Sequence, residues 1–237
     1  MTPRLGLVLS QHNVRRLRRP EPDLAFVLLE RTLFDPPRAA AARRWGEWLR
    51  RMFPDAELVP YAWHLVTHAP EDGLRARSTR TLEGPAHAFG LLQPTREVEQ
   101  AWHASQQTAQ ALGARRIAVR TPTGLAPGPV GTKRVREFAE RHGTEVELLW
   151  EPTGLWTVDE ADAVARDAGV TPILDAFEEP SARAWLRVDP LLRKARLDAD
   201  QTEDLVELLE DRDDSVVVLA GPAALGNLHT LRSAGGW

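Results

Sequence analysis

The chain has 237 residues, of which 43% are hydrophobic and 27% charged, and its formal net charge at pH 7 is −4. This composition is typical of a folded globular protein, and the length suits one β/α barrel of roughly 250 residues. The absence of cysteine excludes disulfides, thiolate nucleophiles, iron–sulfur clusters and cysteine-ligated zinc. The negative net charge argues against a dedicated nucleic-acid-binding protein.

The apolar run near the N-terminus is too short to cross a membrane, and no signal-peptide cleavage site follows it. We therefore expect a cytoplasmic protein that has no membrane partner.

Eight short apolar segments predict strands. Several of them are apolar almost throughout, which is typical of parallel strands covered on both faces. The predicted strands are 4–10, 24–30, 57–63, 115–120, 145–150, 171–175, 183–188 and 215–219.

Longer amphipathic segments between these strands predict helices. Asp35 is expected to cap a helix that starts at Pro36 and stops at Pro54. A second helix is predicted from Pro94 to Gly113. Thr157 and Glu160 form a capping box that predicts the start of a third helix, and Gly169 predicts its end. Three more helices are predicted from hydrophobic periodicity, at 129–142, 200–211 and 222–232.

Eight strands alternating with helices predict a single domain over residues 1–237, folded as a (β/α)8 TIM-type barrel. A doubly wound open sheet is the main alternative. Two connections make the barrel irregular: residues 176–182 are too few for a full helix, and the long segment 64–93 is expected to be functional or mobile.

In a β/α barrel the site lies at the carboxyl ends of the strands. Glu151 ends the fifth predicted strand between Trp150 and Pro152, where burial could raise its pKa and make it a general acid or base. His68 is the second catalytic candidate. His64 precedes it by four residues, but no glutamate completes a metal-binding arrangement with the two, so we expect no metal and no cofactor.

Other residues at the strand ends are candidates for substrate binding. Trp63 and Trp156 could stack on a sugar or a base, although tryptophans are more often core residues. Arg187 could grip an anionic group, or it could form an ion pair with Glu151 or Asp175 instead. The remaining candidates are polar residues that end strands or follow them: Thr67, Asp175 and Glu30.

A short basic run is formed by four arginines, Arg15, Arg16, Arg18 and Arg19. It could contact phosphates. Such a run is more typical of a solvated turn or helix.

Several segments resemble, in order, the family called domain of unknown function 72, the YecE-like, sugar-isomerase-related barrels. Tyr61-Ala-Trp-His-Leu-Val-Thr-His68 is similar to its "KAWQ-[IL]-[IV]-TH" segment, and Trp150-Glu-Pro-Thr-Gly-Leu-Trp156 to its "WEPRG-x-W" segment. Shorter similarities cover most of the remaining chain: Thr32-Leu-Phe-Asp-Pro36, Trp45, Phe89-Gly-Leu-Leu-Gln-Pro-Thr95, Ala111-Leu-Gly-Ala114, Thr121-Pro122, Asp175-Ala-Phe177 and Trp185-Leu-Arg187. The resemblance implies a β/α barrel and no established reaction.

The chain departs from the family pattern at several strand ends. Tyr61 stands at the family's lysine, Leu28 at its glutamate and Thr153 at its arginine, although Glu30 lies two residues after Leu28 on the same face. Further departures are His64, Phe34, Ala220-Gly221 and the segment Arg187-Val-Asp-Pro190. Loss of polar groups on a kept scaffold suggests a divergent member.

Three functions follow from these observations. The first is a barrel that binds a small polar or anionic ligand, or a protein partner, with little or no catalysis. The second is an enzyme acting on a sugar or sugar-phosphate by acid/base chemistry at the carboxyl end of the barrel. The third is a nucleic-acid-processing barrel, which the negative net charge and the scarcity of carboxylates at strand ends disfavour.

Overall fold

The computed structural model describes residues 3–178, 180–189, 196–212 and 214–237. Its eight strands are parallel and form one sheet in the order β3-β2-β1-β8-β7-β6-β5-β4. They are β1 (Arg4–Leu9), β2 (Phe26–Leu29), β3 (Glu57–Pro60), β4 (Arg116–Thr121), β5 (Glu147–Pro152), β6 (Thr171–Asp175), β7 (Trp185–Val188) and β8 (Val216–Leu219). Each observed strand overlaps a predicted one.

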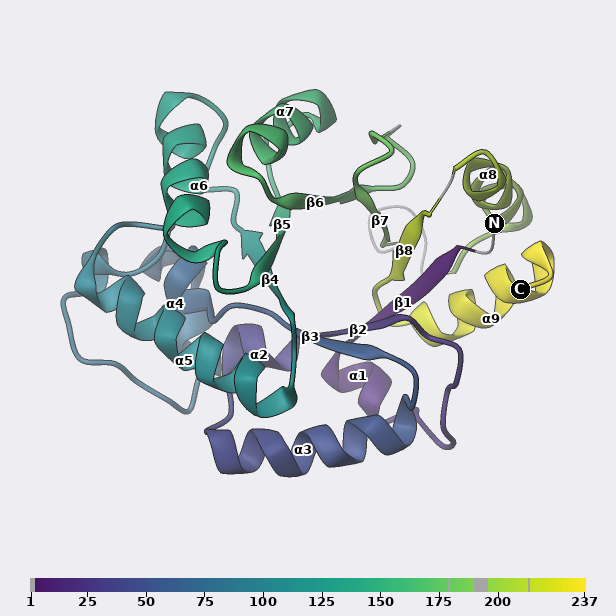
Figure 1. Cartoon of the computed structure of the whole chain (residues 1–237), viewed down its shortest axis with the longest axis horizontal. Coiled ribbons are helices and arrows are strands. Elements are labelled where there is room, and N and C mark those ends of the chain that lie inside the picture. The colour runs from purple at the N-terminus through teal and green to yellow at the C-terminus, as the bar shows by residue number, and fades with distance from the viewer. Residues whose placement is uncertain (1–2, 179, 190–195, 213) are drawn as a thin grey trace.

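The first and last strands of this order meet and close the sheet. A parallel bridge joins Tyr61 to Ala118, and the Ala62 N–H donates to the Ala118 carbonyl at 2.8 Å. The helices lie outside the ring of strands (Figure 1). The predicted (β/α)8 barrel is therefore confirmed, and the open-sheet alternative is wrong.

The described helices are α1 (Gln11–Val14), α2 (Arg31–Phe34), α3 (Ala39–Met52), α4 (His64–Thr67), α5 (Arg96–Leu112), α6 (Pro129–His142), α7 (Val158–Ala168), α8 (Ala199–Glu210) and α9 (Ala224–Gly235). The longer helices occur in the predicted order, whereas the four-residue helices α1, α2 and α4 were not predicted. As predicted, the capping box of Thr157 and Glu160 starts α7, and the left-handed Gly169 ends it. No described helix has both the length and the apolar character that a membrane span needs.

Two helix starts differ from the prediction. Helix α3 begins at Ala39 instead of Pro36, and Asp35 does not cap it. The Asp35 carboxylate instead accepts hydrogen bonds from Thr79 Oγ1 at 2.5 Å and from the Arg80 N–H at 3.2 Å. Helix α5 begins after Thr95, whose hydroxyl accepts from the Val98 N–H and is a better cap than Pro94 can be.

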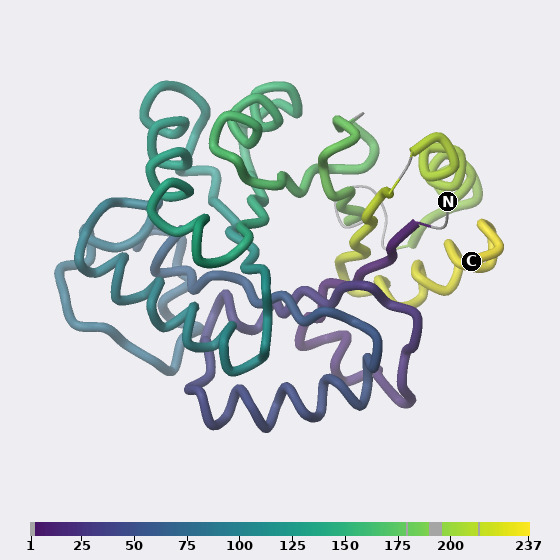
Figure 2. Tube along the Cα trace, viewed as in Figure 1, coloured from purple at the N-terminus to yellow at the C-terminus, as the bar shows by residue number. Residues whose placement is uncertain are grey.

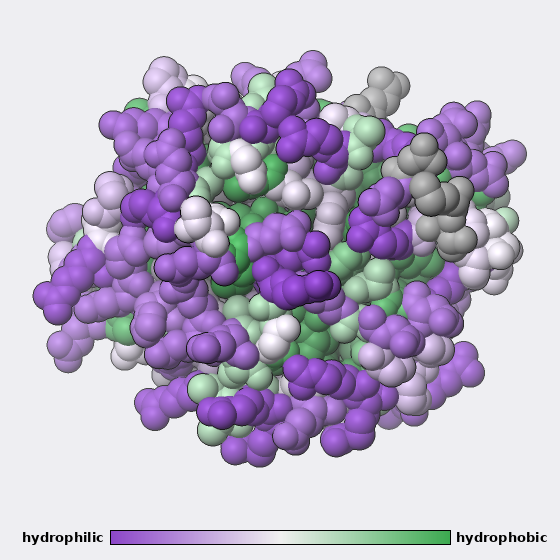
Figure 3. Space-filling model, viewed as in Figure 1, coloured by the Kyte–Doolittle hydropathy of each residue, from purple (hydrophilic) through white to green (hydrophobic). Residues whose placement is uncertain are grey.

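Alternation along the strands separates two apolar layers. One face points into the barrel and is filled by large side chains such as Phe26, Leu28, Leu149 and Trp185. The other face packs against the surrounding helices. Hydrophilic residues cover most of the helices, and hydrophobic ones are visible mainly between the helices and the centre (Figure 3).

The two irregular connections are present. Between β6 and β7 the described residues contain turns and no helix. Segment 64–93 contains α4 and three short 3₁₀ turns, loops out past α5 (Figure 2), and returns beside α4, where the Gly90 N–H donates to the Leu65 carbonyl at 2.8 Å. Pro190, the last residue of the segment 187–190 that differs from the family pattern, lies outside the described residues.

Candidate functional site

Strand register brings charged residues together at the carboxyl end of the barrel, called the mouth below. Arg120 on β4 is the register partner of Glu151 on β5, and Asp175 on β6 is the partner of Arg187 on β7. Arg120, Glu151 and Arg187 each lie two residues after an apolar side chain that points into the barrel. Alternation therefore directs these charged side chains toward the barrel axis.

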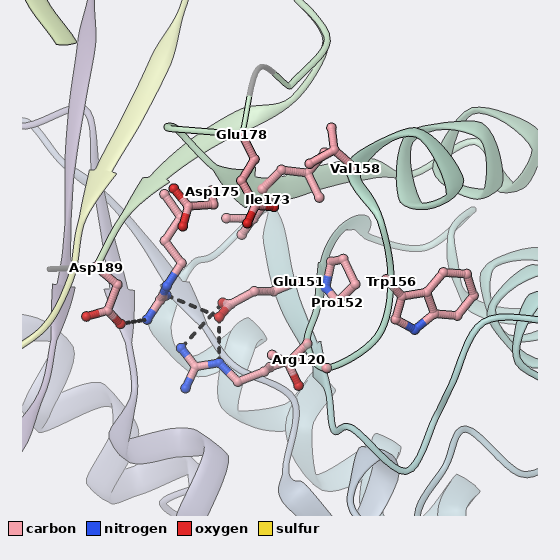
Figure 4. Close-up of a pocket in the computed structure, with 13 residues that line it drawn as sticks. Arg120, Glu151, Pro152, Trp156, Val158, Ile173, Asp175, Glu178 and Asp189 are labelled. Carbon is pink, nitrogen blue, oxygen red and sulfur yellow. Dashed lines mark hydrogen bonds and ion pairs between the residues drawn. The ribbon is translucent and has the colours of Figure 1, made fainter. Parts of the chain in front are cut away.

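The Glu151 carboxylate is the centre of a hydrogen-bonded cluster. The Tyr61 hydroxyl donates to Glu151 Oε2 at 2.7 Å, and Arg120 Nε donates to Oε1 at 2.7 Å. Arg187 Nη1 lies 3.1 Å from the same Oε1, and Arg120 Nη2 donates to the Tyr61 hydroxyl at 3.1 Å. In Figure 4 the Glu151 carboxylate points toward Arg120, and dashed lines mark its ion pairs. We call these four side chains the Glu151 cluster.

The charges around Glu151 decide its protonation. Burial alone raises the pKa of this carboxyl, but the Arg120 and Arg187 guanidiniums and the Tyr61 hydrogen bond outweigh burial and hold the pKa below its usual range. The predicted raised pKa is therefore wrong. Burial and the Glu151 charge raise the pKa of Tyr61, so its hydroxyl stays protonated and donates.

Two more carboxylates extend the cluster. Asp189 Oδ2 lies 2.9 Å from Arg187 Nη2, and Glu30 Oε1 lies 3.7 Å from Arg120 Nη1. Charges thus alternate across the mouth. Of the two ion pairs expected for Arg187, the structure contains the one with Glu151, and the second acidic partner is Asp189 instead of Asp175.

A pocket of about 580 Å³ opens beside the Glu151 cluster. Its walls include four carboxylates and two guanidiniums. The lining residues are Arg120, Glu151, Pro152, Thr153, Gly154, Trp156, Val158, Ile173, Leu174, Asp175, Glu178, Arg187 and Asp189. Acceptor oxygens therefore outnumber cations in the pocket, and Trp156 and Val158 supply apolar wall.

Residues at the end of β4 and in the segment after it hold the loop that follows β5 in place. Thr153 Oγ1 donates to the Thr121 carbonyl at 2.7 Å, and Trp156 Nε1 donates to the Leu125 carbonyl at 2.6 Å. Gly154 has a φ of 93°, and a Cβ there would lie 2.7 Å from the Thr123 Cα. These contacts fix the wall that carries Trp156, which lies beyond Pro152 from Glu151 in Figure 4.

The residues after β3 behave differently from the prediction. Trp63 is fully buried, and its indole N–H donates to the Phe34 carbonyl at 3.2 Å, so its ring has no exposed face on which a ligand can stack. Thr67 is also fully buried, and its hydroxyl pairs with His68 Nδ1 at 2.7 Å. The burial of both side chains therefore argues against the predicted ligand contacts of Trp63 and Thr67.

His68 lies near the Glu151 cluster but does not line the pocket. Burial, together with the charges of His64 and Arg120, lowers the pKa of His68 to about 4. The ring is therefore neutral at neutral pH and is a weak base. Among the described residues, no three His, Asp or Glu side chains are grouped so that they could hold a metal ion.

The structure thus brings together Glu151, Asp175, Arg187 and Trp156 in one pocket. Glu30 and His68 do not line this pocket but lie close to the Glu151 cluster. Tyr61 and Arg120 received no site role from the sequence, although Arg120 ends a predicted strand. One signal could have revealed Arg120: it is a charged residue near the end of an apolar strand, at the same offset as Glu151 on the next strand.

No protein-family model matches the sequence, and no curated protein matches it significantly. Solved structures do resemble it. A DUF72 family protein from Enterococcus faecalis has a TM-score of 0.65 and 10% identity, covering 100% of this chain and 96% of that one. A xylose isomerase domain-containing protein from Salmonella typhimurium has a TM-score of 0.59 and 14% identity over 99% and 97% of the two chains. D-psicose 3-epimerase, crystallised in the presence of D-fructose, has a TM-score of 0.59 and 12% identity over 99% and 100%.

The fold is that of the DUF72 and sugar-isomerase-related barrels. The predicted resemblance is confirmed at this level. Sequence identities of 10–14% show a shared fold only.

Proposed function

We propose that this DUF72-like barrel binds a small, uncharged polyhydroxy ligand of the monosaccharide class in the Glu151 pocket and does not use Glu151 as a proton-transfer group. The observation that carries the proposal is the full engagement of the Glu151 carboxylate by Tyr61, Arg120 and Arg187. A general acid needs a proton to give, and a general base needs a free lone pair and a pKa near the working pH. A carboxylate with a lowered pKa and two cationic partners has neither property.

The pocket walls favour an uncharged ligand over an anionic one. Both guanidiniums already pair with carboxylates, and Asp175, Glu178 and Asp189 add negative charge. Carboxylate oxygens accept hydrogen bonds from hydroxyl groups, whereas they repel phosphate or carboxylate groups. The volume of about 580 Å³ is within the range of small-molecule sites. The structural neighbours give independent support, since one was crystallised in the presence of a ketose sugar.

An enzyme acting on a sugar-phosphate and a barrel that binds a protein partner have less support. An enzyme acting on a sugar-phosphate would need Arg187 for the phosphate, and Arg187 is paired with Glu151 and Asp189. A protein partner would favour an apolar surface patch. Among the described residues the exposed large hydrophobic side chains are Val130 and Leu155, and single exposed apolar residues are ordinary on a protein surface.

Isothermal titration calorimetry with D-fructose, D-psicose and D-xylose tests the proposal. We expect saturable binding of at least one sugar and a loss of about tenfold in affinity in Asp175→Asn, because an amide replaces an acceptor carboxylate in the wall. Asp204→Asn on the exposed face of α8 is the control with the same charge change, and its affinity should equal that of the wild type.

Carbon NMR of the same sugars, incubated with the protein, tests the second half of the proposal. We expect no isomerisation or epimerisation above the rate without protein. Failure of all three sugars to bind would overturn the ligand class. Conversion that disappears in Glu151→Gln, while circular dichroism shows that this variant is folded at the assay temperature, would overturn the non-catalytic role of Glu151.

A further inference from the structure

A second pocket lies at the carboxyl ends of β1 and β2, on the opposite side of the strand order from β4 to β6. Its volume is about 440 Å³, and it shares no lining residue with the Glu151 pocket. Its walls come from the end of β1, from the short helices α1 and α2 that follow the two strands, from α3 and from segment 64–93. They are formed by Leu9, Ser10, Gln11, Val14, Arg15, Arg31, Phe34, Asp35, Trp45, Arg77 and Thr79.

The charge of this second pocket is opposite to that of the first. Arg15, Arg31 and Arg77 line it from three separate segments, against the single carboxylate of Asp35. That carboxylate already accepts hydrogen bonds from Thr79 Oγ1 and the Arg80 N–H. Within the part of the chain that the structure describes, no ion pair joins any of these three arginines to a carboxylate. The pocket therefore has an excess of positive charge.

Aromatic rings position two of the three guanidiniums. The Arg77 guanidinium carbon lies 3.5 Å from the Phe34 ring centroid, and that of Arg31 lies 5.6 Å from the Trp45 ring centroid. A guanidinium stacked on a ring uses its flat face, so the N–H donors at its edge remain directed away from the ring. Arginine edges match phosphate oxygens with two parallel hydrogen bonds.

We propose that this second pocket binds the phosphate group of a small molecule, with Arg31 and Arg77 as the main donors and Arg15 completing the positive wall. The apolar residues of the wall, Leu9, Val14, Phe34 and Trp45, contact the rest of that molecule. The site goes beyond the proposed sugar binding, because it uses another pocket and other residues.

The shape of the site favours a small molecule over a nucleic acid. The three arginines converge on one concavity, whereas a nucleic-acid-binding surface presents a stripe of cations along its whole length. Only Arg15 of the basic run lines the pocket, and Arg16 donates to the Pro222 carbonyl at 3.3 Å. The negative net charge of the chain points the same way.

Titration calorimetry with phenyl phosphate tests the site, since this monoester combines a phosphate with an apolar ring. We expect Arg31→Gln and Arg77→Gln each to weaken binding by about tenfold. Arg44→Gln, on the exposed face of α3 and outside the pocket, changes the charge equally and should leave the affinity unchanged. Far-ultraviolet circular dichroism and the melting temperature establish that each variant is folded.

Three results would overturn the proposal. The first is no measurable binding of phenyl phosphate to the wild type. The second is equal loss of affinity in Arg44→Gln and in the pocket variants, which indicates general attraction by surface charge. The third is tighter binding of a single-stranded oligonucleotide than of phenyl phosphate at the same salt concentration, which indicates a nucleic-acid surface. Loss of sugar binding in the Asp175 variant has no bearing on any of these outcomes.

Discussion

At the scale of single residues, the Glu151 cluster shows how neighbours override burial. A carboxyl group that is enclosed by apolar walls ordinarily binds its proton more tightly. Two guanidiniums and a phenol reverse that tendency at Glu151, which is 3% exposed. The same residue would have a different chemistry if β4 and β7 ended in apolar side chains.

Replacement of Glu151 by glutamine should destabilise the fold strongly. The substitution removes the buried carboxylate between Arg120 and Arg187 and leaves them only the more exposed Glu30 and Asp189 as acidic partners. Removal of one partner from a buried pair costs about 3–5 kcal/mol. Urea unfolding monitored by circular dichroism measures the loss. Glu203→Gln on the exposed face of α8 should change the unfolding free energy by less than about 0.5 kcal/mol. Equal stability of the two variants would contradict this account.

The difference in unfolding free energy between the wild type and Glu151→Gln should depend on pH. The pKa of Glu151 is lower in the folded than in the unfolded chain, so its stabilising contribution is complete above the unfolded value of about 4.5 and is lost as the pH falls through the folded pKa. The difference in stability between wild type and Glu151→Gln should therefore be constant near neutral pH and shrink below about pH 4.5. A difference that grows on acidification would contradict the lowered pKa.

At the scale of elements, the loop after β5 depends on one glycine. Gly154 and Gly169 both have positive φ, at 93° and 67°. A Cβ at Gly169 meets no atom within 4 Å, whereas one at Gly154 meets the Thr123 backbone and side chain. A side chain at Gly169 would therefore cause backbone strain alone, whereas one at Gly154 would cause backbone strain and steric overlap with Thr123.

Alanine at these two positions should have unequal effects. Gly169→Ala is expected to cost about 1–2 kcal/mol from the left-handed conformation alone. Gly154→Ala should cost more and also weaken sugar binding, because the loop that carries Trp156 must shift. Denaturant unfolding and sugar titration of both variants measure this. Equal destabilisation would show that the Thr123 contact is relieved without cost.

At the scale of the whole molecule, the barrel closes at an uneven seam. Strand β1 is paired over four residues with β2 on one side and β8 on the other. The β3–β4 junction has one isolated bridge, Tyr61–Ala118. A junction with fewer backbone hydrogen bonds opens at a lower free energy.

Hydrogen exchange followed by mass spectrometry should reveal this seam. Peptides that cover 57–63 are expected to exchange faster than peptides that cover 4–9, because the Ala62 N–H depends on the single bridging hydrogen bond to Ala118. Equal or slower exchange of 57–63 would show that contacts outside the sheet, such as Thr32 Oγ1 with the Tyr61 carbonyl at 2.9 Å, hold the seam as firmly as ladder hydrogen bonds do.

The sequence by itself determined the architecture and the face that carries the site. Strands buried on both faces must be apolar runs, and helix ends such as Thr157 and Gly169 have local signals, so eight strands and most helix limits follow from short stretches of chain. The strand-end rule also located Glu151, Asp175 and Arg187 in one mouth.

The tertiary structure alone decided what those residues do. The protonation of Glu151 depends on Tyr61, Arg120 and Arg187, which come from three other strand ends far apart in sequence. Trp63 is enclosed by residues of α2 and α5, and no local pattern distinguishes it from the half-exposed Trp156. Electrostatic interaction and burial act through space between distant segments, whereas secondary structure is encoded in neighbours along the chain.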